Sequence, residues 1–218
     1  MSGCCHGCAP KATEVSPRFR KALWIALVIN AGMFVTEIVA GVASGSSSLQ
    51  ADALDFFGDA ANYGVSLFVL GMSLRRRALA SLVKGATMAA FGIWVLASTL
   101  YHLAAGTVPE AAVMGAIGVA ALVANVVVAA LLYAYRDGDS NMRSVWICSR
   151  NDAIGNLAVL GAASGVFATA AGWPDLLVAT GMAALALSGA AQIIRHARAE
   201  LSGDAVGVGG EAAAGHHH

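Results

Sequence analysis

Three aspartates lie close together in a stretch that otherwise has the composition of a membrane helix. Asp52, Asp55 and Asp59 stand in the segment Leu49–Leu74, whose other residues are mostly apolar or small. A carboxylate at the centre of a bilayer costs about 2.5–3.5 kcal/mol by insertion scales, so such residues usually face a bundle interior and mark an ion path. Spacings of three, four and seven put all three side chains on one helical face.

A second polar station stands in the segment Met142–Ala171, where Cys148 and Asp152 are four residues apart and share a face. At 1.5 Å per residue, Asp59 lies about 15 Å from the outer end of its segment and Asp152 about 14 Å from the inner side. The two stations therefore reach similar depth from opposite directions. We predict that Asp55, Asp59, Cys148 and Asp152 form a four-ligand metal site.

Carboxylate and thiolate ligands at about 2.0–2.3 Å suit tetrahedral zinc. One thiolate among carboxylates favours zinc or cadmium over magnesium or calcium. Because these ligands must be deprotonated to bind, metal and protons compete for them, and the site predicts an exchange of metal for protons. Asp52, one turn nearer the outside, is a secondary candidate that either lines the exit or accepts hydrogen bonds.

The composition places this site in a lipid bilayer. Of 218 residues, 58% are hydrophobic and 12% are charged, whereas soluble domains have about 25% charged residues. The mean hydropathy is +0.70. The 13 basic and 13 acidic residues balance, so no overall field attracts a nucleic acid, and we expect no such partner.

The apolar segments predict an all-α fold, a polytopic membrane protein with a bundle of six transmembrane helices over residues 18–200. Each segment is near the ~20 residues that a span needs, and short links make neighbours antiparallel. Residues 1–17 are expected to form a Cys-rich cytoplasmic tail, and residues 201–218 a disordered tail that ends in a tag remnant. The six segments are Phe19–Ala43, Leu49–Leu74, Leu79–Ala105, Glu110–Tyr135, Met142–Ala171 and Asp175–Arg195.

The distribution of Lys and Arg predicts the orientation, because basic residues collect in cytoplasmic links. They lie before the first segment, in the link between the second and third segments, at the ends of the link between the fourth and fifth segments, and at the C-terminal end. The second of these groups is Arg75, Arg76 and Arg77, with Lys84 just beyond. The other three links contain none. Both termini are therefore expected to face the cytoplasm, and the protein is expected in a bacterial inner membrane. Glu37 then falls near the outer end of the first segment, where water is expected to solvate it.

The N-terminal tail contains Cys4, Cys5 and Cys8 with His6 between them. Soft thiolates beside an imidazole can bind zinc, copper or cadmium. The alternative is a tail whose thiols have no specific role, since the cluster lacks a second ligand pair. With Cys148 far away, the cysteines do not form a disulfide framework.

Two motifs carry a family resemblance. Ser-Leu-x-Ala-Asp-Ala-x-Asp-x-x-x-Asp, at Ser48–Asp59, resembles the second-helix motif of the cation diffusion facilitator transporters. Cys148-x-x-x-Asp152-Ala-Ile-Gly-Asn-Leu-Ala-Val-Leu resembles the fifth-helix motif, where the family usually has His or Asp in place of this Cys. The resemblance covers about Phe19 to Arg198. It implies a divalent metal/proton antiporter that exports metal and uses Asp55, Asp59, Cys148 and Asp152 as its transport site.

The sequence departs from the family in two respects. Cys148 replaces the usual ligand, which leaves open whether the metal is zinc or cadmium. The family's cytoplasmic C-terminal domain, which helps dimerisation and metal sensing, is expected to be absent, because no folded soluble domain is predicted after the sixth segment. A homodimer would then be held through the transmembrane helices, and sensing could have moved to the N-terminal cysteines.

Two other functions are compatible with the acidic residues. The first is an intramembrane enzyme with an aspartate dyad at Asp59 and Asp152, although the Gly-x-Gly-Asp pattern of aspartyl intramembrane proteases is absent because Gly58-Asp59 lacks the second Gly. The second is a non-transporting metal-binding sensor or partner subunit. We favour the transporter, which is not an enzyme and needs no prosthetic group, only transported Zn²⁺ (or a related cation) and H⁺.

Overall fold

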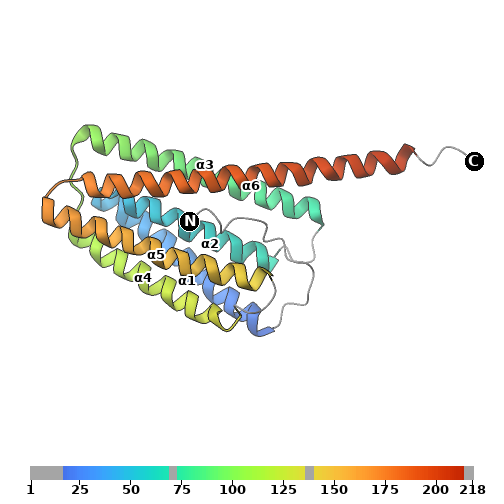
Figure 1. The fold of residues 1–218 in the computed structure, drawn as a ribbon, viewed down its shortest axis with the longest axis horizontal. Coiled ribbons are helices and arrows are strands. Elements are labelled where there is room, and N and C mark those ends of the chain that lie inside the picture. Colours follow the sequence, from blue (N-terminus) through green and yellow to red (C-terminus); the bar gives the residue numbers. More distant parts are fainter. Residues whose placement is uncertain (1–16, 69–72, 136–139, 214–218) are drawn as a thin grey trace, which may run out of the picture.

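The computed structural model describes residues 17–68, 73–135 and 140–213, with the side chains of all of these except 68, 74, 140–151 and 203–213. This part of the chain forms six α-helices and contains no strand (Figure 1). The predicted all-α fold is therefore confirmed. The helices are α1 Pro17–Ser44, α2 Ser47–Phe68, α3 Leu74–Ala105, α4 Ala111–Tyr133, α5 Ser140–Thr169 and α6 Trp173–Ala213.

Five of these helices are long and apolar enough to cross a membrane within the described ranges. They are α1, α3 from Arg75, α4, α5 from Asp152 and α6 up to Ser202. The exception is α2, because every 18-residue stretch of it contains all three aspartates. The prediction of six spanning helices is thus confirmed for five, and the sixth helix is present but polar along one face.

Two helix ends differ from the prediction. Helix α3 begins at Leu74, so the Arg75–Arg77 triplet lies in its first turn and not in a link. Helix α6 continues to Ala213, past its predicted end near Arg195 and into the stretch predicted to be disordered. Arg, Ala, Leu and Glu are strong helix formers, which accounts for the early start of α3 and for the continuation of α6 as far as Leu201, but not for its Gly-rich last turns.

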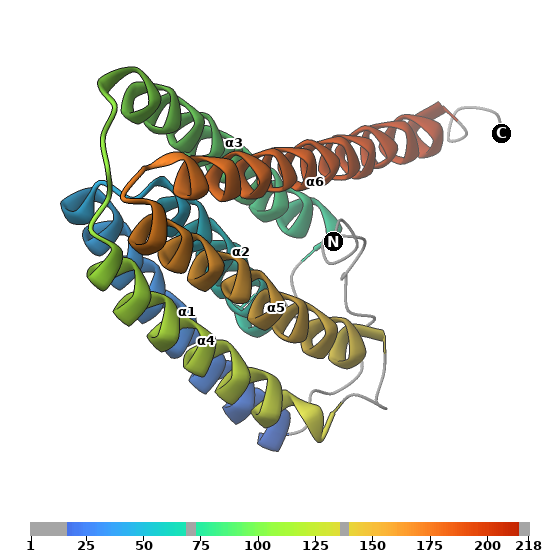
Figure 2. The same ribbon diagram turned by 60° about the vertical axis from the view of Figure 1, so that its left-hand side comes forward.

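Helix α2 occupies the middle of the bundle and contacts each of the other five helices. Figure 2 shows α1, α4 and α5 on one side of it and the α3–α6 pair on the other. The side chains that α2 buries include Leu49, Leu54, Phe56 and Tyr63. A helix with neighbours on all sides can present polar groups to several partners without exposing them to lipid, and this is where the three aspartates lie.

Asp175, near the start of α6, holds the start of α2 at one end of the bundle. Its side chain is fully buried. One carboxylate oxygen accepts from the Ser46 hydroxyl at 2.7 Å and from the Ser48 N–H at 3.0 Å, and the other accepts from the Ser47 N–H at 2.8 Å. The first N–H groups of a helix have no partner within the helix, and a carboxylate is favourable there. Asp175 therefore caps α2 from another helix and fixes its position.

Gly41 permits the close approach of α1 to α2. A Cβ at this position would lie 3.0 Å from the backbone nitrogen of Gln50 and 3.2 Å from the Cβ of Leu49. We expect Gly41→Ala to destabilise the protein by about 1–3 kcal/mol, because the two helices would have to separate. Gly32→Ala is the matched control on the same helix, since nothing lies within 4 Å of its Cβ position. Thermal melting in detergent should show a loss for Gly41→Ala alone; equal melting temperatures would contradict this packing.

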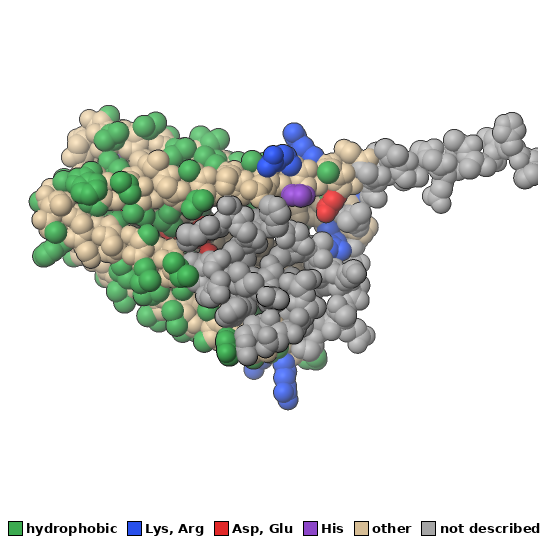
Figure 3. Space-filling model, in the orientation of Figure 1, with side chains coloured by type: hydrophobic (Ala, Val, Ile, Leu, Met, Phe, Trp, Pro, Cys, Tyr) green, Lys and Arg blue, Asp and Glu red, His purple; other side chains and the backbone are tan. Residues whose placement is uncertain are grey.

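Large hydrophobic side chains cover much of the outer surface. Val28, Val35, Val39 and Val42 of α1 are all more than half exposed. On the face seen in Figure 3, hydrophobic side chains spread over the end where α6 begins, and basic side chains gather toward the opposite end. An apolar outer surface with charges at one end is typical of a protein that lies in a bilayer.

Candidate functional site

Helices α2 and α5 pack against each other, and their acidic residues meet. The carboxyl groups of Asp59 and Asp152 lie within hydrogen-bonding reach of each other. Asp59 is 7% exposed, whereas Asp152 is half-buried. The Tyr63 hydroxyl, one turn further along α2, donates to Asp59 Oδ2 at 2.8 Å. Three polar groups from two helices thus converge close to the middle of the bundle.

The repulsion between two carboxylates in contact can be relieved in only a few ways. Two like charges at hydrogen-bonding distance in a buried site cannot both remain unless something offsets them. A hydrogen bond between them requires one shared proton. A divalent cation held by both carboxylates is the other solution, since it supplies two positive charges. Either a shared proton or a bound cation would therefore relieve the repulsion between Asp59 and Asp152.

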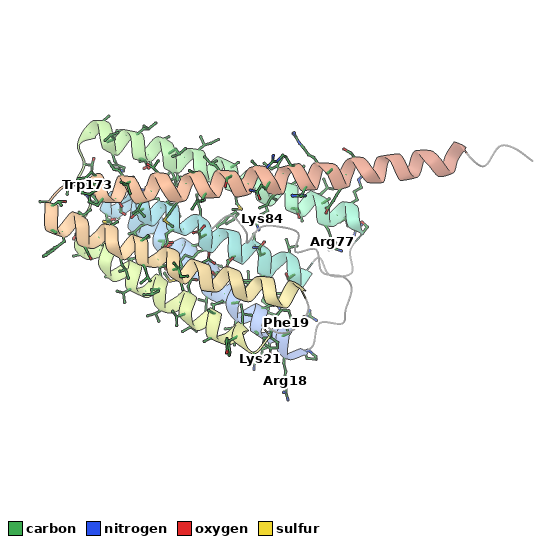
Figure 4. The ribbon with its side chains drawn as sticks, in the orientation of Figure 1. Arg18, Phe19, Lys21, Arg77, Lys84 and Trp173 are labelled. Carbon is green, nitrogen blue, oxygen red and sulfur yellow. The ribbon has the colours of Figure 1, made fainter. Side chains whose placement is uncertain are left out.

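A basic residue of α3 lies beside this pair. Lys84 is 8% exposed, and its Nζ donates to Asn62 Oδ1. Asn62 is three residues after Asp59 and therefore on a neighbouring part of the same helical surface. The ammonium group also interacts electrostatically with Asp59. Figure 4 shows Lys84 on the side of α3 that faces the rest of the bundle.

Asp52 has a different partner from Asp59. Its carboxyl group meets that of Glu37 on α1, and both residues are almost fully buried, at 2% and 0% exposed. The expectation that water solvates Glu37 near the outer end of α1 is therefore wrong. Glu37 is seven residues before the end of α1. At that level α1 still packs against α2, so the side chain is covered by protein. Asp55, half-buried, is near enough to repel Glu37.

This second carboxyl pair is poor in hydrogen-bond donors. Within the described part of the chain, no N–H or O–H group reaches either oxygen of Glu37 or Oδ2 of Asp52. The two carboxyl groups lie against each other, and one shared proton would satisfy both. Asp52 thus contacts a carboxyl of α1 and not the Asp59–Asp152 pair.

The structure does not display a complete metal-binding cluster. Among the side chains that it describes, no three His, Cys, Asp or Glu residues come together as a metal site. Cys148 lies in α5 one turn before Asp152, but its side chain is outside the described set, as are Cys4, Cys5 and Cys8. The roles of Asp55, Asp59, Cys148 and Asp152 as ligands stay predictions, of which the structure shows only that Asp59 and Asp152 touch.

Three residues at or near the site were not identified from the sequence as parts of it. Tyr63 is four residues after Asp59, so the helical period places it on the same face. Lys84 stands within an otherwise apolar segment, ten residues after Leu74. Glu37 is likewise a charged residue within an apolar helix. In each case, the position of a polar side chain within a membrane helix could have indicated that the residue belongs to the site.

A family model of known proteins matches most of the chain. Residues 23–202 match the family model of the cation efflux transmembrane domain. This range contains all six helices apart from the start of α1 and the end of α6. A comparison with curated proteins found no match.

Proposed function

The chain belongs to the cation efflux family, and we propose that this membrane transporter exports a divalent metal ion, Zn²⁺ or the related Cd²⁺, in exchange for protons. The observation that carries the proposal is the contact between the carboxyl groups of Asp59 and Asp152. These groups come from adjacent helices near the middle of each. An integral membrane protein has little reason to bury such a pair unless a charged species passes there.

In the proposed cycle, a metal ion that enters from the cytoplasm replaces the proton shared by the two aspartates. Both carboxylates then coordinate the metal, with Asp55 and Cys148 as further ligands. Every proton released on binding is taken up again from the other side when the metal leaves, so metal and protons move in opposite directions. Movement of the α3–α6 pair relative to α1, α4 and α5 around α2 would alternate access to the site.

The orientation that we propose places both termini in the cytoplasm of a bacterium. The ends of the helices that hold Arg18, Lys21 and Arg77 then face the cytoplasm, in agreement with the rule that basic residues stay inside. Figure 4 shows these residues on the side of the bundle opposite Trp173. Helix α2 spans the bilayer in this arrangement, with its acidic face covered by protein.

Proteoliposomes with an internal pH-sensitive dye test the proposal. Zinc added outside should enter vesicles in which the cytoplasmic face of the protein lies on the outside, and its entry should drive protons out. An imposed pH gradient with the acidic side inside should drive zinc uptake. Cadmium should substitute for zinc, whereas magnesium and calcium should not, because a thiolate ligand favours softer ions. Stoichiometric zinc binding without any flux would contradict transport and indicate a sensor.

The Tyr63 hydroxyl should contribute to metal binding by orienting Asp59. Hydrogen bonds that orient metal ligands are typically worth 10–100-fold in affinity, so we expect Tyr63→Phe to weaken zinc binding about tenfold while the ring still fills its buried place. Tyr101→Phe removes an exposed hydroxyl and is the control. Isothermal titration with zinc measures both, and an unchanged affinity for Tyr63→Phe would exclude this role.

A further inference from the structure

Lys84 is the one buried Lys or Arg among the side chains that the structure describes. It lies ten residues after the first residue of α3, about 15 Å along the helix. At that depth the side chain cannot reach water past the end of the helix as lysines near membrane surfaces do. Figure 4 shows it further along α3, toward the middle of the bundle, than Arg77 at the start of the helix.

The ammonium group of Lys84 points toward the acidic site. It donates to the side-chain oxygen of Asn62, which follows Asp59 by three residues, and it attracts the Asp59 carboxylate. Helix α3 lies close to α2 at this level, because a Cβ on Gly58 would be 3.5 Å from the Met88 Cε atom. Two separate contacts between α2 and α3 therefore fix Lys84 beside Asp59.

A buried ammonium is stable only if a negative group or strong acceptors surround it. Asn62 supplies an acceptor but no charge, whereas the attraction to Asp59 offsets part of the positive charge. The same attraction offsets part of the negative charge of the Asp59–Asp152 pair. Lys84 cannot leave the site as a bound ion can. It thus supplies a permanent positive charge next to the place where, in the proposed function, a divalent cation binds.

We propose that Lys84 acts as a tethered cation that competes with the transported metal for the Asp59–Asp152 pair. When the site holds no metal, its positive charge stabilises Asp59. When the metal binds, the ammonium repels it and loses part of its attraction to Asp59, so the metal is held less tightly. Lys84 is a positioning and tuning residue, not a ligand, and its consequence is a site that releases metal readily. This inference rests on the proposed function.

Removal of the charge should therefore tighten metal binding. Repulsion between a single and a double charge in a partly buried site is large compared with thermal energy. We expect Lys84→Met and Lys84→Gln to bind zinc at least about tenfold more tightly than the unmodified protein. Lys84→Arg keeps the charge and should bind with nearly unchanged affinity. Transport by Lys84→Met should be slower at saturating zinc, because release becomes harder.

The experiment is isothermal titration of the purified full chain with zinc at a fixed pH, combined with zinc uptake by proteoliposomes. Lys21→Met, which removes an exposed lysine charge of α1, is the matched control and should change neither affinity nor uptake. A residue that only packs would give weaker or unchanged binding when replaced. An increase in affinity in Lys84→Met and Lys84→Gln, with a normal affinity in Lys84→Arg, supports the proposal.

The possible failures are distinguishable. If the unmodified protein does not bind zinc, the proposed function fails and this inference fails with it. If the unmodified protein binds and transports zinc but Lys84→Met and Lys84→Gln stay within twofold of it, or bind more weakly, the competing role of Lys84 is refuted and the proposed function stands. If Lys84→Met does not fold, Lys84→Gln and Lys84→Arg decide the question, because Gln still has an N–H donor for Asn62.

Discussion

Asp152→Ala is expected to abolish zinc-driven proton flux while the protein remains folded. The substitution removes one of two carboxyl groups that meet between α2 and α5, and with it one of the proposed anionic ligands of the metal. We expect zinc affinity to fall about 100-fold or more, which corresponds to ~3 kcal/mol. Two carboxyl groups in contact, one of them buried, are costly to the fold, so the variant should be no less stable than the unmodified protein.

Proteoliposomes that contain equal amounts of each protein measure this prediction. Asp152→Asn keeps the size and hydrogen-bonding capacity of the side chain and should lose transport as well, because it lacks the charge. Glu200→Ala, which removes an exposed carboxylate of α6, should transport normally. Near-normal flux in Asp152→Ala, with a melting temperature equal to that of the unmodified protein, would remove Asp152 from the transport site.

Asp175→Ala is expected to have the largest effect on stability. It would leave the Ser46 hydroxyl and the N–H groups of Ser47 and Ser48 without their acceptor, in a place where water does not reach. Each buried donor left unpaired costs about 1–3 kcal/mol. We therefore expect a loss of roughly 3 kcal/mol or more, with the start of α2 no longer held to α6.

Thermal melting of the detergent-solubilised protein tests the role of Asp175. Glu110→Ala is the control, because Glu110 is exposed near the same end of the bundle and its side chain makes no capping hydrogen bond. Asp175→Asn should fall between the two, since its side-chain oxygen can accept but has no charge. A melting temperature for Asp175→Ala equal to that of Glu110→Ala would show that the three hydrogen bonds contribute little.

The central contact of the site could be predicted from sequence because depth can be counted along a helix. Asp59 and Asp152 were placed at similar depth from opposite directions, and the structure joins them. The same reasoning put Asp52 on the same helical face as Asp59, one turn nearer the outside than Asp55, as a secondary candidate that lines the exit or accepts hydrogen bonds. It could not show that Asp52, about 10 Å further along the helix axis, lies at a level where α1 supplies Glu37.

The remaining differences have a common physical origin. Helical periodicity gives the direction of a side chain but not which neighbour lies in that direction, and α2 has five neighbouring helices. Lys84 was interpreted with the Arg75–Arg77 triplet as part of the orientation pattern, because α3 was expected to begin later than it does. Glu37 was placed in water because its distance from a helix end was known and its cover by α2 was not.

The cost of the two acidic pairs is consistent with a functional origin. A bundle selected only for stability would place apolar residues at Asp59 and Glu37, since isosteric hydrophobic groups in such positions often stabilise a protein. Residues that violate the rules of packing tend to lie at functional sites. The pair at Asp59 and Asp152 has a proposed function in the exchange, and the surrounding contacts of Tyr63 and Lys84 follow from it.

An anomalous-difference map from crystals grown with cadmium tests the central claim most directly. The account predicts a peak between α2 and α5, with oxygens of both Asp59 and Asp152 at coordination distance, and its loss in Asp152→Ala. Cadmium bound with full occupancy elsewhere in the protein, and no density between these two aspartates, would contradict it.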